Sequence, residues 1–364
     1  MSMANLMEAN GDPILQEDLE IIAGDNGFFS GLAGSSILIT GATGLVGSQL
    51  ARALACYNRV HGADMRIYLL VRSRAKAADI FGALLERGDV TVLTGDVTDP
   101  FEDYFADDLP LDYIVHAASV TASKMMVEKP VETIRISLEG TRQMLELARQ
   151  HAVRAMIYVS SMEMYGTVDF DRPVTETDLG YIDPLRVRSN YPESKRMCEN
   201  MCVAYHAEYG VPVRIARLSQ TFGAGILKGE NRVFAQFARS AINGQDIVLH
   251  TAGRSEGNYC YTRDTIRGLL TILLHGQDAE AYNVANEACH TTIAAMAHLV
   301  AEQIAGAAIQ VVFDIPETNT FGYAPDTKLK LSSAKLRALG WEPQVELTEA
   351  YRRMIASILS QKAE

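Results

Sequence analysis

SILITGATGLVG, residues 36–47, is the stretch of sequence that decides the fold. Its first five residues form a short apolar run, which is typical of a strand buried on both faces of a sheet. Gly41 allows a tight turn, Gly44 lets the backbone approach a pyrophosphate, and Gly47 lets the next helix pack closely on the sheet. The N-terminus of that helix offers N–H groups and partial positive charge to the same phosphates. We therefore expect a dinucleotide to bind along Gly41, Thr43, Gly44, Leu45, Val46 and Gly47.

Strand-like and helical stretches alternate along most of the remaining chain. Further strands are expected at 65–71, 90–93, 113–116, 155–159, 213–218 and 282–285. Helices are expected between them, at 45–56, 130–151, 194–209 and 265–275. Such alternation predicts an α/β fold, a doubly wound parallel Rossmann sheet with right-handed crossovers.

The alternation is absent from three segments, which suggests how the domains divide. Residues 1–34 precede the first strand and contain an amphipathic stretch at 15–23, so we expect an N-terminal extension. We expect residues 220–259 and the tail 286–364 to form a smaller, mostly C-terminal substrate-binding lobe over the carboxyl edge of the sheet, where ligands bind in such folds. The NAD(P)-binding Rossmann domain then comprises 35–219 and about 260–285.

Composition excludes several classes of protein. The chain has 364 residues, of which 48% are apolar, enough for a sizeable core. Its formal charge of −12 gives no general attraction for nucleic acid or an anionic membrane. No run of about 18 apolar residues predicts a membrane span. The first residues lack a basic head followed by an apolar stretch, so we expect no signal peptide and a cytoplasmic location.

The five cysteines are scattered and odd in number, which fits free thiols in a reducing cytoplasm. Cys198 and Cys202 are one helical turn apart, as in half a metal site. Neither a second pair nor a well-spaced His cluster accompanies them in the sequence, so we expect no metal.

Tyr191 and Lys195 lie one turn apart on a single face of a predicted helix. A free tyrosine has a pKa of about 10 and is a poor base at neutral pH. A nearby ammonium favours the phenolate and lowers that pKa, and an oxidised nicotinamide adds a second positive charge. The pair is then expected to accept a proton from an alcohol that is losing a hydride.

The ends of the second and third strands bear on the choice of cofactor. An NAD site usually has an acid after the second strand, whereas this chain has Arg72 and Arg74. These arginines suit the 2′-phosphate of NADP, or Arg72 stacks on the adenine; the alternative is two solvated loop residues. Asp96, with Val97 beside it, is placed to accept a hydrogen bond from the adenine amino group.

Small residues follow the fourth strand, at Ala117, Ala118 and Ser119. They let the backbone pass close to the cofactor ribose, so we expect all three to contact the cofactor. His116, which precedes them, is interpreted as a core residue without a catalytic role.

Together these motifs resemble the extended short-chain dehydrogenase/reductase family, in its nucleotide-sugar epimerase/dehydratase branch. The resemblance covers roughly residues 35–355 and rests on the glycine motif and on 95–97, 116–118, 160–161, 191–195 and 217–223. It implies a nicotinamide cofactor, a nucleoside-diphosphate sugar as substrate and a homodimer. The helices expected at 130–151 and 194–209 are candidates for the dimer interface, although their apolar stripes also suit ordinary burial. For several of its activities the family uses NAD, so the choice between NAD and NADP stays open.

The resemblance also implies a catalytic set of Ser161, Tyr191 and Lys195. Ser161 is expected to hydrogen-bond the sugar hydroxyl, and Lys195 to hold the nicotinamide ribose and lower the pKa of Tyr191. Further contacts implied are Val159 and Leu218 with the cofactor and Ser119 with the substrate.

Residues 161–166 resemble the Thr/Ser-x-Glu-x-Tyr-Gly segment of sugar 4,6-dehydratases and UDP-glucuronate decarboxylases. In the dehydratases this glutamate takes the C5 proton once C4 is a ketone, so Glu163 is the expected second acid/base. The alternative is a strand-end glutamate that faces water. Residues 181–191 also resemble the decarboxylase branch, which implies that Arg188 meets an anionic group of the substrate.

The chain departs from the family pattern at several positions. Met162 stands where the dehydratases carry the aspartic acid that expels the C6 hydroxyl, and a thioether cannot donate a proton. Epimerisation, decarboxylation or simple redox chemistry is then favoured over 4,6-dehydration. Gln220 replaces an asparagine at the substrate diphosphate, and Gly257 replaces a phosphate-gripping arginine. The remaining substrate contacts expected are Arg232 or Arg254, and Tyr261.

Three functions are consistent with these residues. The first is an NAD(P)-dependent nucleotide-sugar epimerase, dehydratase or decarboxylase that transiently oxidises a sugar hydroxyl, at C4. The second is an NADPH-dependent reductase of a keto-sugar or other carbonyl, which Arg72 and Arg74 favour. The third is a dinucleotide-sensing protein without turnover, which the intact Tyr191 and Lys195 argue against.

Overall fold

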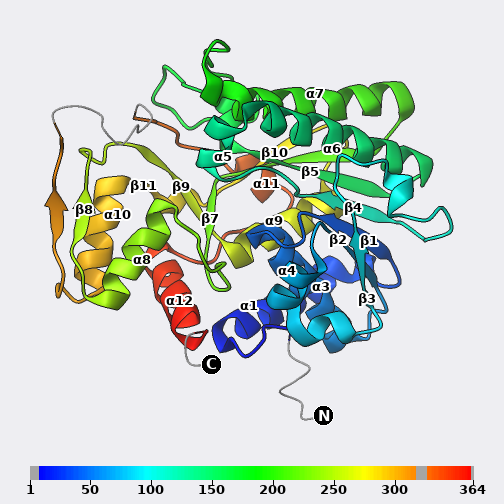
Figure 1. The fold of residues 1–364 in the computed structure, drawn as a ribbon, viewed down its shortest axis with the longest axis horizontal. Helices are drawn as coiled ribbons and strands as arrows, with labels where there is room; N and C mark the ends of the chain where they lie inside the picture. The colour runs from blue at the N-terminus through cyan, green and yellow to red at the C-terminus, as the bar shows by residue number, and fades with distance from the viewer. Residues whose placement is uncertain (1–7, 317–325, 362–364) are drawn as a thin grey trace.

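The computed structural model describes residues 8–316 and 326–361. Its centre is a parallel sheet of seven strands in the order β10-β6-β5-β4-β1-β2-β3 (Figure 1). Their bounds are β1 (Ser36–Thr40), β2 (Arg66–Val71), β3 (Val90–Thr94), β4 (Tyr113–His116), β5 (Ala155–Ser161), β6 (Val213–Leu218) and β10 (Ala281–Val284). The predicted doubly wound Rossmann sheet is therefore confirmed.

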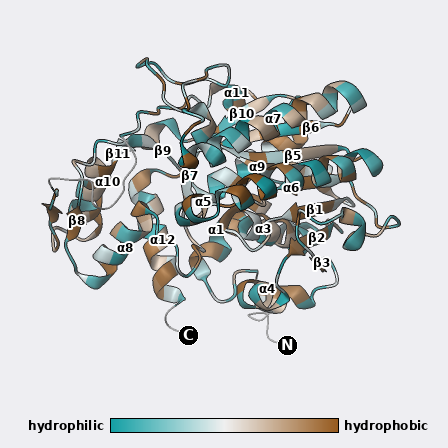
Figure 2. Cartoon of the chain, turned by 45° about the horizontal axis from the view of Figure 1, so that its top comes forward, coloured by the Kyte–Doolittle hydropathy of each residue, from teal (hydrophilic) through white to brown (hydrophobic). Residues whose placement is uncertain are grey.

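Helices cover both faces of this sheet (Figure 1). One face packs against α6 (Pro130–Gln150) and α7 (Asn190–Tyr209), and the other against α3 (Leu45–His61) and α9 (Thr262–His275). All five residues of β1 are buried, as expected for a strand between two helical layers. Figure 2 shows hydrophobic segments gathered on the central strands and on α9, with hydrophilic ones toward the outer loops.

Two helix boundaries differ from those expected from the sequence. The helix expected to begin at Ser194 begins at Asn190, so Tyr191 lies in its first turn. Pro192 also lies in that turn, where the missing N–H of a proline costs no helical hydrogen bond. The helix expected at 45–56 continues to His61, where Gly62 ends it in a left-handed conformation.

Two smaller sheets lie at one end of the molecule, beside α8 (Val233–Asn243) and α10 (Ile293–Leu299) (Figure 1). Strand β9 (Glu256–Tyr261) pairs with β7 (Gln220–Phe222) and with β11 (His290–Thr292), while β8 (Ile247–Leu249) pairs with β12 (Val311–Phe313). Strands from the segment 220–259 therefore pair with strands from the tail after 286. The domain boundaries themselves stay a prediction.

The remaining helices are short, apart from α1 and α12. They are α1 (Pro13–Ala23), α2 (Asn26–Phe29), α4 (Arg74–Phe81), α5 (Ser123–Glu128), α11 (Ala334–Arg337) and α12 (Leu347–Ser360), with a π-helical turn at Val300–Ile304. No helix within the described ranges is both long and apolar enough to cross a membrane. All five cysteines are buried and free.

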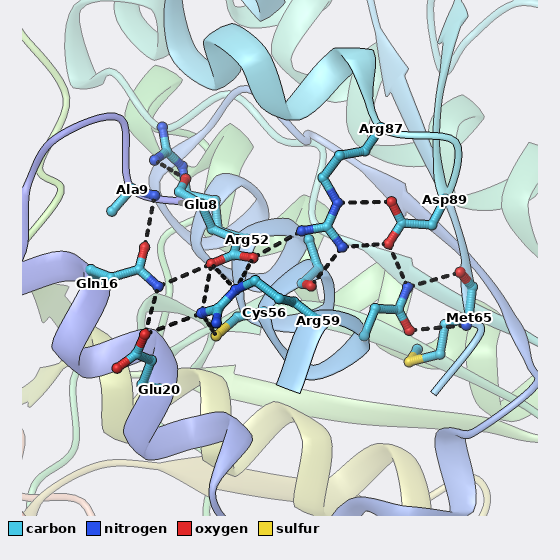
Figure 3. Close-up of polar contacts among 12 residues, drawn as sticks. Glu8, Ala9, Gln16, Glu20, Arg52, Cys56, Arg59, Met65, Arg87 and Asp89 are labelled. Carbon is cyan, nitrogen blue, oxygen red and sulfur yellow. Dashed lines mark hydrogen bonds and ion pairs between the residues drawn. The ribbon is translucent and has the colours of Figure 1, made fainter. Parts of the chain in front are cut away.

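The N-terminal extension is fixed to the rest of the protein by buried charges. Glu8 is fully buried and accepts hydrogen bonds from Arg59 and from Arg87 (Figure 3). Asp18, on α1, accepts from Arg353 of α12 at 2.9 Å and from the Tyr261 hydroxyl at 2.5 Å. Residues 8–24 are thus part of the folded core, in contact with both the Rossmann layers and α12.

Candidate active site

The glycine loop joins β1 to α3 and lies against the loop that follows β4. Gly41 has a φ of +65°, and a Cβ atom there would lie 2.7 Å from the backbone of Ala117 and Ala118. A Cβ atom on Gly47 would lie 2.4 Å from the carbonyl oxygen of Gly41. Both glycines are therefore required by close backbone approach, and the two loops predicted to hold the cofactor meet at the carboxyl edge of the sheet.

The groups around this edge suit a dinucleotide. Ser119 Oγ is buried and has no hydrogen-bond partner of normal geometry in the described part of the chain, although it faces the Tyr191 phenol. A buried hydroxyl without a partner is costly, and a ligand such as the cofactor ribose would satisfy it. Thr40 Oγ1 accepts from the Ala118 N–H at 3.2 Å and contacts His116 Nδ1 at 2.7 Å. Burial lowers the pKa of His116 to about 3, so it is a neutral core residue.

The two arginines after β2 are placed differently from one another. Arg74 donates to the carbonyl oxygen of Val92 at 2.9 Å and to Thr94 Oγ1 at 3.1 Å, so β3 already holds it. Arg72 is 75% exposed, and its Nη1 lies 3.9 Å from Asp96 Oδ2. The other Asp96 oxygen, Oδ1, accepts hydrogen bonds from the N–H and the hydroxyl of Thr98. One carboxylate oxygen thus faces Thr98 and the other faces Arg72.

Ser161, Tyr191 and Lys195 come together at the end of β5. The Ser161 hydroxyl faces the Tyr191 phenol and also accepts the Glu163 N–H at 3.2 Å. Lys195 Nζ donates to the carbonyl oxygen of Val159 at 2.8 Å and lies 5.6 Å from the centre of the Tyr191 ring. Tyr191 and Lys195 are both buried.

The net shift of the Tyr191 pKa is upward, whereas Lys195 was expected to lower it. Burial raises the pKa of Tyr191 to about 12, the charge of Glu163 adds to this, and Ser161 and Arg188 oppose it. Burial also lowers the pKa of Lys195 to about 8. The physical reason is that removal from water disfavours the charged form of both groups, more strongly than they stabilise one another.

Glu163 and Arg188 form an ion pair beside the tyrosine. Arg188 Nη2 donates to Glu163 Oε2 at 2.9 Å, and both side chains remain about a third exposed, at 36% and 37%. The Arg188 guanidinium carbon lies 5.8 Å from the centre of the Tyr191 ring. Glu163, the expected acid/base, and Arg188, the expected anion-binding group, therefore lie together beside Tyr191, where a ligand can reach both.

A buried network that the sequence did not reveal supports this site. Glu199, one turn after Lys195, accepts from Arg217 Nη2 at 2.7 Å and from Ser160 Oγ at 2.6 Å. Arg217 also donates to the hydroxyl of Tyr165, which ends the turn that carries Glu163. The one sign of this network in the sequence is the spacing of Lys195 and Glu199, which places both on one face of α7. The network ties β5, β6 and α7 together beneath Ser161, Tyr191 and Lys195.

Arg196 makes a second connection of this kind. Its guanidinium donates to the carbonyl oxygens of Met164 at 2.7 Å, Tyr165 at 3.2 Å and Gly180 at 2.7 Å. It therefore holds the turn that carries Glu163 against the helix that carries Tyr191.

The residues expected to bind substrate are only partly brought together. Tyr261 is 1% exposed and its hydroxyl donates to Asp18 of α1, so its expected role as a substrate contact is wrong: the phenol joins the N-terminal extension to β9. Arg232 pairs with Glu230 at 2.7 Å and precedes α8. Gln220 is half-buried at the start of β7, which directly follows β6 and its buried end residue Leu218.

Comparisons with known proteins agree with this architecture. The family model described as "NAD dependent epimerase/dehydratase family" matches residues 37–285. UDP-glucuronic acid decarboxylase 6 of Arabidopsis thaliana is 29% identical over 314 residues, which are 86% of this chain and 85% of that protein. UDP-glucuronic acid decarboxylase 1 of Xenopus tropicalis is 29% identical over 325 residues, which are 88% of this chain and 71% of that protein.

Solved structures share the fold. The dTDP-glucose 4,6-dehydratase of Bacillus anthracis in complex with NAD superposes with a TM-score of 0.73 at 18% identity, over 90% of this chain and 98% of that one. The UDP-glucuronic acid 4-epimerase of Bacillus cereus, in complex with UDP-glucuronic acid and NAD, gives 0.72 at 20% identity, over 90% and 99%.

Proposed function

Because this chain belongs to the NAD-dependent epimerase/dehydratase family, we propose that it oxidises C4 of a nucleotide-linked uronic acid and releases the C5 carboxylate as carbon dioxide. One observation carries this choice of substrate: the cation of Arg188 lies beside Tyr191 and its only ion pair among the described residues is with Glu163. A sugar carboxylate has the same charge and shape as the Glu163 carboxylate to which Arg188 donates. The decarboxylases among the similar proteins support the same choice.

The first step proposed is removal of the C4 hydroxyl proton. Tyr191 accepts this proton, and Ser161 hydrogen-bonds the same oxygen and orients it. When bound, a nicotinamide cofactor supplies the hydride acceptor for C4, a positive charge that favours the phenolate, and the return of the hydride at the end of the cycle. Lys195, which is buried one helical turn from Tyr191, contributes its positive charge to the same place.

The C4 ketone makes loss of the carboxylate favourable. The bond from C5 to the carboxyl carbon breaks, carbon dioxide leaves, and its electron pair is delocalised onto the C4 oxygen, which Tyr191 and Ser161 hydrogen-bond. Arg188 positions the carboxylate before it leaves. Glu163, released from Arg188 and partly exposed, takes a proton from water and delivers it to C5. Reduction at C4 then completes a pentose nucleotide with no net change in the cofactor.

We propose NAD as the cofactor. A 2′-phosphate would need a cationic site, but Arg74 is already bound to β3 and Arg72 lies near the carboxylate of Asp96. The NAD in the two solved structures supports the same choice. We also propose that the protein is a cytoplasmic homodimer whose subunits meet through α6 and α7. These helices expose the apolar residues Val131, Ile134, Met197 and Val203. Light scattering tests the proposed dimer.

A second candidate is the NADPH-dependent reductase, since Arg72 is 75% exposed and its 3.9 Å contact with Asp96 is long enough to be exchanged for one with a phosphate. One experiment separates the two. Purified protein is denatured, the released dinucleotide is identified, and UDP-, dTDP-, GDP- and CDP-sugars are screened by mass spectrometry. Bound NAD, with loss of carbon dioxide from a nucleotide uronic acid, supports the decarboxylase. Absence of bound cofactor, with consumption of added NADPH by a keto-sugar, supports the reductase, and absence of any turnover supports a sensing protein.

A further inference from the structure

The ammonium of Lys195 lies in an unusual environment. Lys195 is 3% exposed, and the carbonyl oxygen of Val159 accepts the one hydrogen bond that its Nζ makes among the described residues. An ammonium has three N–H donors. Its other neighbours are aromatic faces: Nζ lies 4.9 Å from the centre of the Tyr158 ring and 5.6 Å from that of Tyr191.

The charged groups around Lys195 are occupied by other partners. Glu199, on the same helix, is bound by Arg217 and Ser160, and Glu163 is bound by Arg188. Other titratable neighbours are neutral at pH 7, because burial lowers the pKa of His116 to about 3 and raises the pKa of the thiols of Cys198 and Cys202. No carboxylate in the described part of the chain hydrogen-bonds Lys195, so its positive charge needs another source of stabilisation.

We propose that the face of the Tyr158 ring is a positioning group for catalysis, which keeps Lys195 protonated and directed at the cleft through a cation–π contact. The contact comes from β5, so the strand that ends in Ser161 also sets the charge of the lysine. This inference deepens the role proposed for Lys195 and rests on the proposed function only for its kinetic readout. Burial lowers the pKa of Lys195 to about 8, so a further fall of about one unit would leave about half of the lysine neutral at pH 7.

The ring, and not the hydroxyl, is the part of Tyr158 that acts. The Tyr158 hydroxyl is buried, lies near the Cys198 thiol and has no hydrogen-bond partner of normal geometry within the described ranges. An unpaired buried hydroxyl stabilises nothing, so Tyr158→Phe should keep the cation–π contact and the fold.

Fluorinated phenylalanines at position 158 test the proposal in the full-length protein. Successive ring fluorines weaken a cation–π contact while they scarcely change side-chain volume, so folding is preserved. The pKa of Lys195 is measured by carbon NMR on lysine labelled at Cε, with its signal assigned through Lys195→Arg. From Tyr158→Phe to the trifluorinated ring we expect this pKa to fall stepwise, by about one unit in all.

The matched control is the same series at Phe105. This ring lies in the same hydrophobic layer but contacts Tyr68 and His151 instead, so the Lys195 pKa should not change. A Lys195 pKa that is constant across the series at 158, or that falls equally with the series at 105, overturns the proposal.

A kinetic measurement then connects the contact to catalysis. Since Lys195 must be protonated, the basic limb of the kcat profile should move to lower pH along the same series. The NMR titration needs no substrate, so its result stands even if the proposed function is wrong. A Lys195 pKa that does not change along the series refutes the cation–π role and leaves the proposed function untouched.

Discussion

Lys195 lies 5.6 Å from the centre of the Tyr191 ring and donates its hydrogen bond to the carbonyl oxygen of Val159, not to the phenol. The two residues are therefore neighbours that share no hydrogen bond with one another. The pKa of Tyr191 is about 12 and that of Lys195 about 8, so the phenolate–ammonium state needs a further positive charge or a substrate to become accessible.

Replacement of the phenol tests its role as the base. We expect Tyr191→Phe to reduce kcat by at least about 10³-fold, because the C4 hydroxyl then has no proton acceptor. The dissociation constant of the dinucleotide, measured by calorimetry, should change less than about threefold, since the glycine loop provides most of that binding. Turnover near the wild-type rate in this variant contradicts the mechanism.

Glu163→Gln tests the delivery of a proton to C5. In deuterated water we expect the wild-type product to carry deuterium at C5, and the variant to release product at least about tenfold more slowly. Oxidation at C4, followed by cofactor absorbance in a single turnover, should persist. Undiminished product release with normal deuterium incorporation at C5 would reduce Glu163 to a partner of Arg188.

The cofactor loop is tested by a pair of glycine substitutions. Gly41 and Gly62 both have positive φ, at +65° and +60°, but only at Gly41 would a Cβ atom collide, 2.7 Å from the backbone after β4. Gly41→Ala should therefore abolish dinucleotide binding in calorimetry. Gly62→Ala should cost only about 1 kcal/mol of stability from its strained backbone, with binding unchanged. Equal losses of binding in both variants would refute the predicted cradle.

Burial of the Lys195 charge predicts a pH-dependent stability. Its pKa falls from 10.5 in the unfolded chain to about 8 in the folded protein, so the folded state is penalised below pH 8 and gains stability as pH rises from about 8 to 10.5. At pH 7 we expect Lys195→Met to be more stable than wild type, by up to about 3 kcal/mol, with a gap that closes by pH 10.5. Urea unfolding at the two pH values measures the free energy of unfolding of the variant and of wild type, with Lys76→Met at an exposed lysine as control. A gap that does not vary with pH contradicts the assigned shift.

Whereas removal of the Lys195 charge should stabilise the protein, removal of one charge from the buried pair of Arg217 and Glu199 should destabilise it. Glu199→Gln leaves the Arg217 guanidinium uncompensated in the core, which should destabilise the protein by about 3–5 kcal/mol in urea unfolding. The exposed pair of Arg142 and Glu139 is the control, for which Glu139→Gln should cost less than about 1 kcal/mol. Similar costs at the two sites would mean that the buried network is not a structural support of the catalytic set.

The elements of the fold could be predicted because their signals are local. The apolar run at β1 and the glycines after it lie within a dozen residues, and they place the cofactor edge of the sheet. The spacing of Tyr191 and Lys195 likewise needs only one helical turn. Their pKa values could not be predicted, because burial depends on the whole core and outweighs the nearest charge.

Contacts between distant segments explain the other differences. Arg188 and Glu163 are 25 residues apart, and no periodicity indicates that they form one ion pair. Tyr261 and Asp18 are 243 residues apart. The sequence therefore could not show that the Tyr261 hydroxyl donates to Asp18 of the N-terminal extension instead of contacting substrate. The positions of side chains in loops and between lobes required the tertiary structure.

The most direct test of transient oxidation at C4 uses a nucleotide uronic acid that carries deuterium at C4. We expect carbon dioxide and a pentose nucleotide that retains the label at C4, with slower turnover than the unlabelled substrate and no net reduction of NAD. A product that has lost the label at C4, or a decarboxylation rate unaffected by the label, would rule out transient oxidation at C4.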